Sequence, residues 1–166
     1  MREINTQTIK ETVKQLFWQA NYEIGPDILE ALRHGLRQEE SATGRAILEQ
    51  ILQNNETAAG EKMPICQDTG MAVLFIKLGQ DVRIVGGDFN EAVNQGVREA
   101  YTEGYLRKSL VTDPIFDRIN TKDNTPAVIH LELVPGDKIN ILVTSKGFGS
   151  ENMSRLKMMT PAEGEE

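Results

Sequence analysis

The chain has 166 residues, of which 39% are apolar and 26% charged, as expected for a soluble globular protein with enough length for one domain and its core. The formal net charge of −7 argues against nucleic-acid binding, because neutralising phosphates requires a basic surface. No apolar run approaches the roughly 18 residues that crossing a bilayer requires. The N-terminus also lacks the apolar core of a signal peptide, so we expect a cytoplasmic protein that binds no membrane.

The first third of the sequence predicts three helices. Apolar residues recur at helical spacing through residues 5–21. Gly25-Pro26 opens a second helix, since proline is tolerated at the first helical position, and Ser41 or Thr43 can cap a third. Each helix has an apolar face that needs a partner, formed in chain order by Ile9, Val13, Leu16, Phe17 and Ala20, by Leu29, Leu32 and Leu36, and by Ile47, Leu48, Ile51 and Leu52.

The pattern changes after Asn54. Residues 60–70 are rich in glycine and polar side chains and predict a loop. The apolar run 71–78 predicts a buried strand, with residues 82–85 as its hairpin partner. Asp88 and Glu91 match a capping box, which opens a long helix that reaches about Ser109.

The last third begins with an irregular stretch and then predicts a second hairpin. Its strands are residues 128–134 and 139–144, joined by a Pro-Gly-Asp turn. Ser150 or Asn152 could start a short terminal helix. These elements predict an α+β fold, with a helical part over residues 1–55 and an antiparallel sheet packed with helices over residues 62–150. We expect one domain over residues 1–166.

The loop at residues 64–70 is the first stretch that could carry chemistry. Cys66 is the one cysteine of the chain, which excludes an internal disulfide and a metal site built from several cysteines of these 166 residues. Gln67 and Asp68 follow it directly, and loops before buried strands often hold reactive groups. The same residues are also consistent with a buried Cys66, a solvent-facing Gln67 and a plain turn at Asp68.

Two further stretches contain candidate anion-binding groups. In residues 146–152, Gly147 and Gly149 would let the backbone approach an anion, and Lys146 adds a positive charge. Ordinary strand-to-helix connections contain glycine too, and the spacing fits neither the Walker A nor the Rossmann nucleotide-binding pattern. In residues 101–109, Arg107 and Lys108 fall in the expected last helical turn, where the helix dipole favours cations. The pattern there favours a structural role.

Three strings together resemble one enzyme family. They are Cys-Gln-Asp-Thr-Gly at 66–70, Tyr-Thr-Glu-Gly-Tyr-Leu-Arg-Lys-Ser at 101–109 and Lys-Gly-x-Gly-Ser-Glu-Asn-Met-Ser at 146–154. In order and approximate spacing they resemble the class I, iron–sulfur-dependent fumarate hydratases and the related L(+)-tartrate dehydratase α subunits. Members of this family hold a [4Fe–4S] cluster with three cysteines and leave the fourth iron open to substrate. The resemblance implies that Cys66 is a cluster ligand.

The same resemblance implies a dicarboxylate site lined by Gln67, Asp68, Arg107 and Gly149, with Asp68 taking part in catalysis. The implied reaction is the reversible hydration of fumarate to L-malate, and the alternative is dehydration of L(+)-tartrate. The implied partners are a β subunit or β domain, a C4 dicarboxylate and further copies or subunits in an oligomer.

Two departures from the family pattern shape the expectations for this chain. Phe148 stands where the family often has a third glycine. The other cluster cysteines of family α subunits lie beyond the part that this chain resembles, so we expect a truncated α subunit that alone holds no stable cluster and is inactive. A non-catalytic iron–sulfur-linked sensor or interaction module, or a purely structural fragment, are the rival hypotheses.

Overall fold

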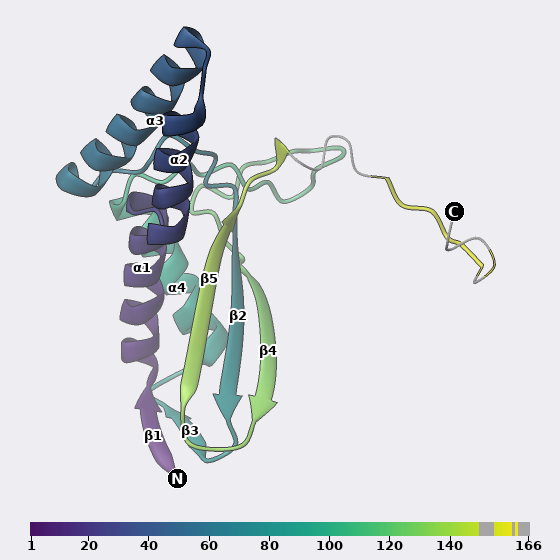
Figure 1. Ribbon diagram of the computed structural model, residues 1–166. Coiled ribbons are helices and arrows are strands. Elements are labelled where there is room, and N and C mark those ends of the chain that lie inside the picture. Colours follow the sequence, from purple (N-terminus) through teal and green to yellow (C-terminus); the bar gives the residue numbers. More distant parts are fainter. Residues whose placement is uncertain (150–154, 161, 163–166) are drawn as a thin grey trace.

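The computed structural model describes residues 1–149, 155–160 and 162 of the chain. Its elements are β1 (Arg2–Asn5), α1 (Thr6–Tyr22), α2 (Pro26–Gln38), α3 (Ala42–Glu61), β2 (Met71–Gly79), β3 (Val82–Val85), α4 (Phe89–Glu103), β4 (Val128–Val134) and β5 (Ile139–Lys146). Helices α1 and α4 lie against a three-stranded sheet, and α2 and α3 project from one end of this body (Figure 1). The predicted α+β class is confirmed. The helix expected to start at Ser150 or Asn152 lies outside the described residues.

Side-chain caps set the starts of three helices. Asn5 accepts a hydrogen bond from the Gln7 N–H at 2.8 Å, and Asp88 accepts one from the Glu91 N–H at 2.8 Å. Ser41, not Thr43, caps α3 through a 3.3 Å bond from the Gly44 N–H. Pro26 occupies the first turn of α2, as predicted. Each cap satisfies a backbone donor that the helix itself leaves unpaired.

The pairing of the strands differs from the two predicted hairpins. β2 lies between β4 and β5, parallel to β4 and antiparallel to β5, so β4 and β5 are neighbours in sequence but not in the sheet. β3, predicted to pair with β2, instead pairs in parallel with β1 at the N-terminus. The sheet is therefore mixed, and both hairpin predictions are wrong.

The central position of β2 explains this arrangement. Its residues Ala72, Leu74 and Ile76 are all buried, and a strand with a neighbour on each edge exposes no unpaired backbone edge. The connection 135–138 crosses over the end of β2, where the Gly79 N–H donates to the Lys138 carbonyl at 2.8 Å. A side chain at Gly79 would collide with the Gly136 carbonyl. The predicted turn after residue 134 is present, but it connects β4 to β5 across the end of β2 and does not join two neighbouring strands.

The core lies between one face of the sheet and helices α1 and α4. Its fully buried centre contains Phe17 of α1 and Tyr101 of α4, whose ring centroids lie 6.0 Å apart. The two helices are also joined along their outer side by ion pairs, Lys10–Glu99 at 3.1 Å and Lys14–Glu103 at 2.6 Å. α1 and α4 therefore form one continuous helical layer on this face of the sheet.

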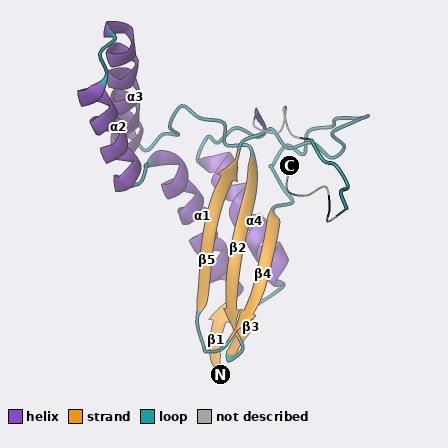
Figure 2. Ribbon diagram, turned by 45° about the vertical axis from the view of Figure 1, so that its right-hand side comes forward, coloured by secondary structure: helices purple, strands orange, loops and turns teal. Residues whose placement is uncertain are grey.

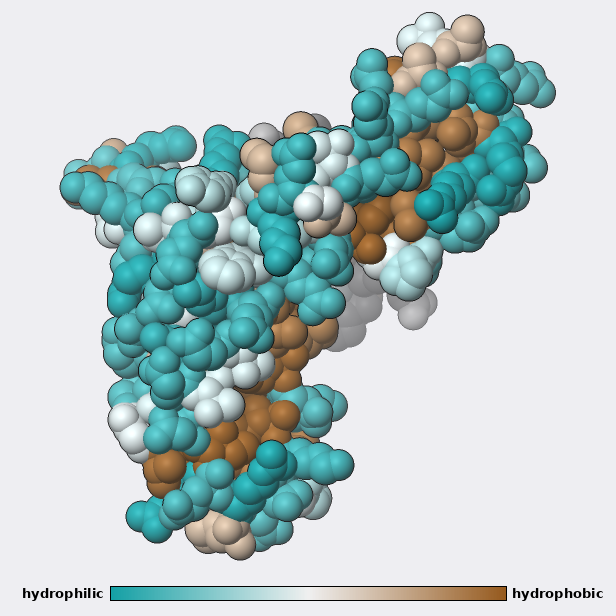
Figure 3. All heavy atoms as spheres, turned by 90° about the vertical axis from the view of Figure 1, so that its left-hand side faces the viewer, coloured by the Kyte–Doolittle hydropathy of each residue, from teal (hydrophilic) through white to brown (hydrophobic). Residues whose placement is uncertain are grey.

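Helices α2 and α3 pack on each other and project from this body. Within its described range, Pro26–Gln38, α2 has no fully buried residue. Apolar side chains gather in a band along the projecting pair, and a second apolar area lies near the edge formed by α1 and β5 (Figure 3). Ile28, Ile47 and Ile51 of the pair are exposed by 40% or more. Among the described residues, no helix has both the length and the apolar character needed to cross a membrane.

Helix α4 ends earlier than its sequence pattern indicated. The predicted helix reached about Ser109, but α4 stops at Glu103, with Gly104 as its C-cap and Tyr105 in the left-handed region at φ 57°. A left-handed residue after the last turn is a common way to end a helix. Arg107 and Lys108 therefore lie beyond the helix, and the proposed dipole role in its last turn is wrong for both.

Candidate active site

The loop between α3 and β2 presents three consecutive polar side chains to solvent. Cys66, Gln67 and Asp68 are exposed, whereas Ile65 before them and Thr69 after them are buried. Two bonds hold the start of the loop: the Ile65 N–H donates to the Asn21 carbonyl at 2.9 Å, and the Cys66 N–H donates to the Asn54 side chain at 3.0 Å. The alternative of a buried Cys66 is therefore wrong, because Ile65 fills the core position.

Asp68 is where the three sequence motifs meet. Its Oδ1 accepts a bond from the Gly70 N–H at 3.1 Å, and its Oδ2 accepts one from the Phe148 N–H at 3.2 Å. Arg107 Nη1 lies 3.7 Å from Asp68 Oδ1. Residues separated by up to 80 positions thus converge on one carboxylate. Gly149 directly follows Phe148, and Ser150 lies outside the described residues.

The close approach of two chain segments at Gly70 makes this convergence possible. Gly70 has φ +42°, and a side chain there would collide with the backbone carbonyl of Lys146. Met71, the first residue of β2, pairs with Lys146, the last residue of β5. The loops at this end of the sheet, opposite the N-terminus, are gathered in one region (Figure 2). Antiparallel pairing of β2 and β5 therefore brings the Asp68 loop beside Gly147 and Phe148.

Arg107 is exposed and only loosely held. Its side chain is 72% exposed, against 34% for that of Asp68, so solvent screens their ion pair and its contribution to stability is small. The backbone is held more firmly, because the Thr69 hydroxyl donates to the Arg107 carbonyl at 3.1 Å. The guanidinium can therefore exchange Asp68 for an incoming carboxylate without moving the main chain.

A layer of hydrogen-bonded polar side chains, Asn21, Tyr101 and Ser145, supports the loop from the protein interior. The Tyr101 hydroxyl donates to the Thr69 carbonyl at 2.8 Å, and Gln67 Nε2 donates to the Asn21 side-chain oxygen at 3.2 Å. Asn21 in turn donates to Ser145 Oγ of β5 at 3.0 Å. Burial raises the pKa of Tyr101 to about 12, so its hydroxyl stays protonated and remains a donor at neutral pH.

Sequence reasoning missed the residues of this layer. Tyr101 falls inside one of the family strings but was not given a role, and Asn21 was treated as a helix end. A buried asparagine at the last turn of an otherwise apolar helix face is a weak signal that a polar partner lies opposite. Nothing in the local pattern identifies Ser145 as that partner.

Cys66 is an exposed thiol at the wall of a surface pocket. This pocket has a volume of about 470 Å³, and its other walls include Leu32, Ile47 and Ile51 of the projecting helices. Within the part of the chain that the structure describes, no three His, Cys, Asp or Glu side chains are arranged to hold a metal ion. The sequence therefore offers at most one cysteine ligand to a metal or cluster.

Comparison with known proteins gives one consistent result. The family model described as fumarate hydratase (Fumerase) matches residues 10–166. Among curated proteins, the chain is 32% identical over 165 residues to the putative L(+)-tartrate dehydratase subunit alpha of Methanocaldococcus jannaschii, covering 94% of this chain and 56% of that protein. It is 39% identical over 125 residues to the anaerobic class I fumarate hydratase of Escherichia coli K12, covering 75% of this chain and 23% of that protein.

A third relative has the same character. The L(+)-tartrate dehydratase subunit alpha of Escherichia coli UTI89 is 32% identical over 144 residues, covering 84% of this chain and 46% of that protein. The chain thus spans about half the length of the tartrate dehydratase subunits and about a quarter of the fumarate hydratases that it matches. The resemblance seen in the three strings is confirmed, and this chain belongs to the fumarate hydratase (Fumerase) family.

Proposed function

We propose that this chain forms part of the active site of an iron–sulfur-dependent hydro-lyase that adds water to a C4 dicarboxylate or removes it, with fumarate and L-malate as the first substrate pair. The observation that carries this proposal is the convergence at Asp68 of Arg107 and the Phe148 backbone N–H. An exposed guanidinium beside the glycine-rich turn at Gly147 and Gly149 suits a substrate that carries carboxylates.

Arg107 would bind one substrate carboxylate. Its guanidinium can form two parallel hydrogen bonds with a carboxylate, and this pairing strengthens when proton removal from the adjacent carbon builds negative charge on that carboxylate. The backbone N–H of Gly149 would supply a further donor, since that of Phe148 is held by Asp68, and Gln67 would hydrogen-bond the substrate through its amide. Interactions of this kind lower the barrier because they are strongest in the transition state.

Asp68 would act in proton transfer or orient the group that does. In the described structure both of its oxygens already accept backbone hydrogen bonds, from Gly70 and Phe148. Those bonds fix the direction of the carboxylate, which would help to keep it within hydrogen-bond reach of the proton that it transfers. When substrate displaces Arg107 from Asp68, the carboxylate keeps its backbone donors and its position.

Cys66 would provide one thiolate ligand to a [4Fe–4S] cluster. When bound, such a cluster supplies a Lewis-acidic iron that makes a substrate hydroxyl a better leaving group. A cubane with an open iron requires three thiolates, and the sequence contains one cysteine. The remaining ligands and a β subunit or β domain would therefore come from outside these 166 residues, in keeping with the subunit names of the tartrate dehydratase relatives.

L(+)-tartrate is the second candidate substrate. The α subunits of the tartrate dehydratases match this chain over about half of their own length, more than the fumarate hydratases do. Comparing kcat/KM for L-malate and for L(+)-tartrate on the complete enzyme separates the two. A larger value for tartrate would replace the first proposal by the second.

The roles of Cys66 and Arg107 are tested together in the complete enzyme, assembled without oxygen. Cys66→Ser should lose cluster iron and activity, because a hydroxyl is a hard and weakly acidic ligand. Arg107→Lys should keep its iron and lose about 1–3 kcal/mol of transition-state stabilisation, because lysine cannot form the paired planar contact. Iron content and malate kinetics are measured on the same samples. Loss of iron in Arg107→Lys, with full iron and activity in Cys66→Ser, would contradict both assignments.

A further inference from the structure

Asn124 is a fully buried amide that joins two segments of the candidate site. Its exposed fraction is 0%. Asn124 Nδ2 donates to the Gly70 carbonyl at 2.8 Å, and Asn124 Oδ1 accepts from the Leu110 N–H at 3.0 Å. Gly70 ends the loop that carries Asp68, and Leu110 lies three residues after Arg107. One side chain therefore bridges the two segments that carry the charged groups of the site.

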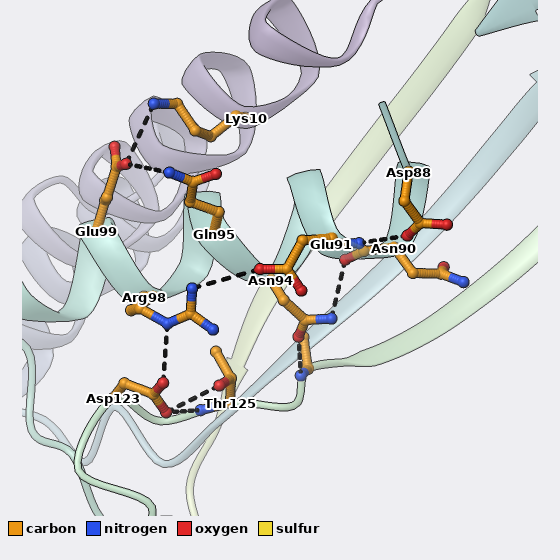
Figure 4. Close-up of polar contacts among 11 residues, drawn as sticks. Lys10, Asp88, Asn90, Glu91, Asn94, Gln95, Arg98, Glu99, Asp123 and Thr125 are labelled. Atoms are coloured by element: carbon orange, nitrogen blue, oxygen red, sulfur yellow. Dashed lines mark hydrogen bonds and ion pairs between the residues drawn. The ribbon is translucent and has the colours of Figure 1, made fainter. Parts of the chain in front are cut away.

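The residues on both sides of Asn124 are fastened to α4. Arg98 Nε donates to Asp123 Oδ2 at 2.8 Å, and Asp123 Oδ1 accepts from both the Thr125 N–H and the Thr125 hydroxyl (Figure 4). The Ala127 N–H donates to the Asn94 side chain at 2.8 Å. Burial alone would raise the pKa of Asp123, but the bonds from Arg98 and Thr125 outweigh it and lower that pKa, so Asp123 stays charged and keeps this attachment at neutral pH.

A second bridge runs beside the first. The Tyr101 hydroxyl, also from α4, donates to the Thr69 carbonyl, and the Thr69 hydroxyl donates to the Arg107 carbonyl. The consecutive carbonyl groups of Thr69 and Gly70 are thus each held by a side chain. The first accepts from Tyr101 of α4, and the second accepts from Asn124, whose neighbour Asp123 is bonded to α4. Because both bridges also reach the 107–110 segment, they define the separation between Asp68 and Arg107.

Asparagine is well suited to this position for two reasons. Its side chain offers a donor and an acceptor at once, which the Gly70 carbonyl and the Leu110 N–H require. Its backbone lies in the left-handed region at φ 61°, which asparagine adopts more readily than most residues. Removing the amide donor would leave the buried Gly70 carbonyl unpaired, and removing the acceptor would leave the partly buried Leu110 N–H unpaired, so either change should loosen the bridge.

We propose that Asn124 is a positioning residue of the active site, which sets the distance between Asp68 and Arg107 by bridging the Gly70 carbonyl and the Leu110 N–H. This inference rests on the proposed function, because it assigns to Asn124 the alignment of the two groups that act on the dicarboxylate. Because Asn124 is fully buried, it would act through the placement of Asp68 and Arg107 and not on the substrate directly.

The test compares Asn124→Asp with Asn94→Ala in the complete enzyme. Asn124→Asp keeps the shape and the acceptor but replaces the amide donor by an oxygen that repels the Gly70 carbonyl. Asn94→Ala removes one attachment of the same segment, at Ala127, but leaves in place the Arg98–Asp123 ion pair that holds the segment on α4 and both bonds of the Asn124 amide. At a pH where the introduced carboxyl is ionised, we expect kcat/KM of Asn124→Asp to fall by about tenfold to a hundredfold at unchanged iron content, the scale on which a small misplacement acts. Asn94→Ala should stay within about threefold of wild type.

A pH series separates alignment from general destabilisation. Burial raises the pKa of the introduced carboxyl, and once protonated it regains a donor for the Gly70 carbonyl. The neighbouring Tyr101 hydroxyl does not titrate in this range, since its pKa is about 12, and Asp123 faces Arg98 on the surface of α4. The ratio of Asn124→Asp to wild-type activity should therefore rise as pH falls, while the Asn94→Ala ratio stays flat. A flat ratio for Asn124→Asp, or an equal loss in Asn94→Ala, would overturn the positioning role.

Amide hydrogen exchange tests the bridge without any activity measurement. Peptides covering residues 66–71 and 107–112 should exchange faster in Asn124→Asp and at the wild-type rate in Asn94→Ala. Unchanged exchange in Asn124→Asp would refute the bridge. Faster exchange with full activity would show a bridge that does not position the site, and would overturn the proposal. If wild-type enzyme has no hydro-lyase activity, the proposed function fails, and the positioning role fails with it, whereas exchange still decides whether the bridge exists.

Discussion

At the scale of single residues, the candidate site depends on buried polar groups more than on the exposed ones. Cys66, Gln67 and Asp68 face solvent, and their positions are set by Asn21, Tyr101 and Asn124 underneath. A buried hydrogen bond contributes little net energy when made, but a buried group left without a partner is costly. The support layer therefore makes one loop conformation much more favourable than its alternatives.

The Tyr101 hydroxyl offers a direct measure of this effect. Tyr101→Phe should lower the free energy of unfolding by about 1–2 kcal/mol, because the buried Thr69 carbonyl loses its donor. Tyr22→Phe is the matched control, since the Tyr22 hydroxyl also donates to a backbone carbonyl, that of Gly104 at 3.1 Å, but in a partly exposed place where water can replace it. Urea unfolding of both variants at pH 7 gives the comparison. An equal or larger loss in Tyr22→Phe would contradict the importance of the buried bond.

At the scale of elements, α4 is the scaffold on which the site is assembled. It contributes Tyr101 to the layer under the loop, and through Arg98 and Asn94 it anchors the 123–127 segment (Figure 4). Its early end at Gly104 releases the chain so that Arg107 can turn toward Asp68. A helix that continued to Ser109 would have carried Arg107 further along the helix axis.

The attachment of this segment should depend on pH through Asp123. Its pKa is lowered in the folded protein from the ordinary 3.8, so the stabilisation from its charged form is complete above about pH 3.8 and is lost as pH falls through the lower folded value. At pH 7, Asp123→Asn should be less stable than wild type by about 1 kcal/mol, a value reduced for partial exposure. The difference in the free energy of unfolding between wild type and Asp123→Asn, measured by urea unfolding, should become smaller as the pH is lowered toward 3.

An exposed ion pair provides the control for Asp123. Arg37 and Glu30 of α2 lie 2.8 Å apart, but both side chains are about 60% exposed. Glu30→Gln should leave the free energy of unfolding at pH 7 close to that of wild type, because solvent screens such pairs. If the difference in the free energy of unfolding between Asp123→Asn and wild type stays constant from pH 7 to pH 3, the charge on Asp123 is not what holds the segment.

At the scale of the whole molecule, the site lies where several helices and strands begin or end. β2 begins, β5 ends, and α1 and α4 both terminate at the same end of the sheet (Figures 1 and 2). The α2–α3 pair projects from this end and lines the pocket beside Cys66. The division of the chain into one domain over residues 1–166 stays a prediction.

The number of thiolates limits what the 166 residues can do alone. With Cys66 as the one cysteine, the isolated chain should form no stable [4Fe–4S] cluster, because three thiolates are needed for this type of site. Anaerobic reconstitution followed by iron and sulfide analysis measures this, with the complete enzyme as the positive control. The prediction would be wrong if the isolated chain held four irons and four sulfides and showed the broad absorbance at roughly 400 nm of thiolate-ligated clusters.

The kinds of elements and the chemistry to look for could be predicted from local sequence patterns. Helix starts at Asn5, Pro26, Ser41 and Asp88 follow local rules that act within one turn, and the apolar run of β2 marks a buried strand whatever its neighbours. The three strings identified the family because their residue types and order are visible without a fold. These inferences hold because each depends on residues close together in the chain.

Which segments meet depends on packing between residues far apart in the chain. The choice of β4 and β5, and not β3, as neighbours of β2 depends on burying one strand between two others, and no local pattern encodes that competition. The end of α4 at Gly104 and the burial of Ile65 in place of Cys66 depend likewise on packing against distant residues. Asn124 has an ordinary loop sequence around it, and its role as a bridge exists only because Gly70 and Leu110, 40 positions apart, lie on either side of its amide.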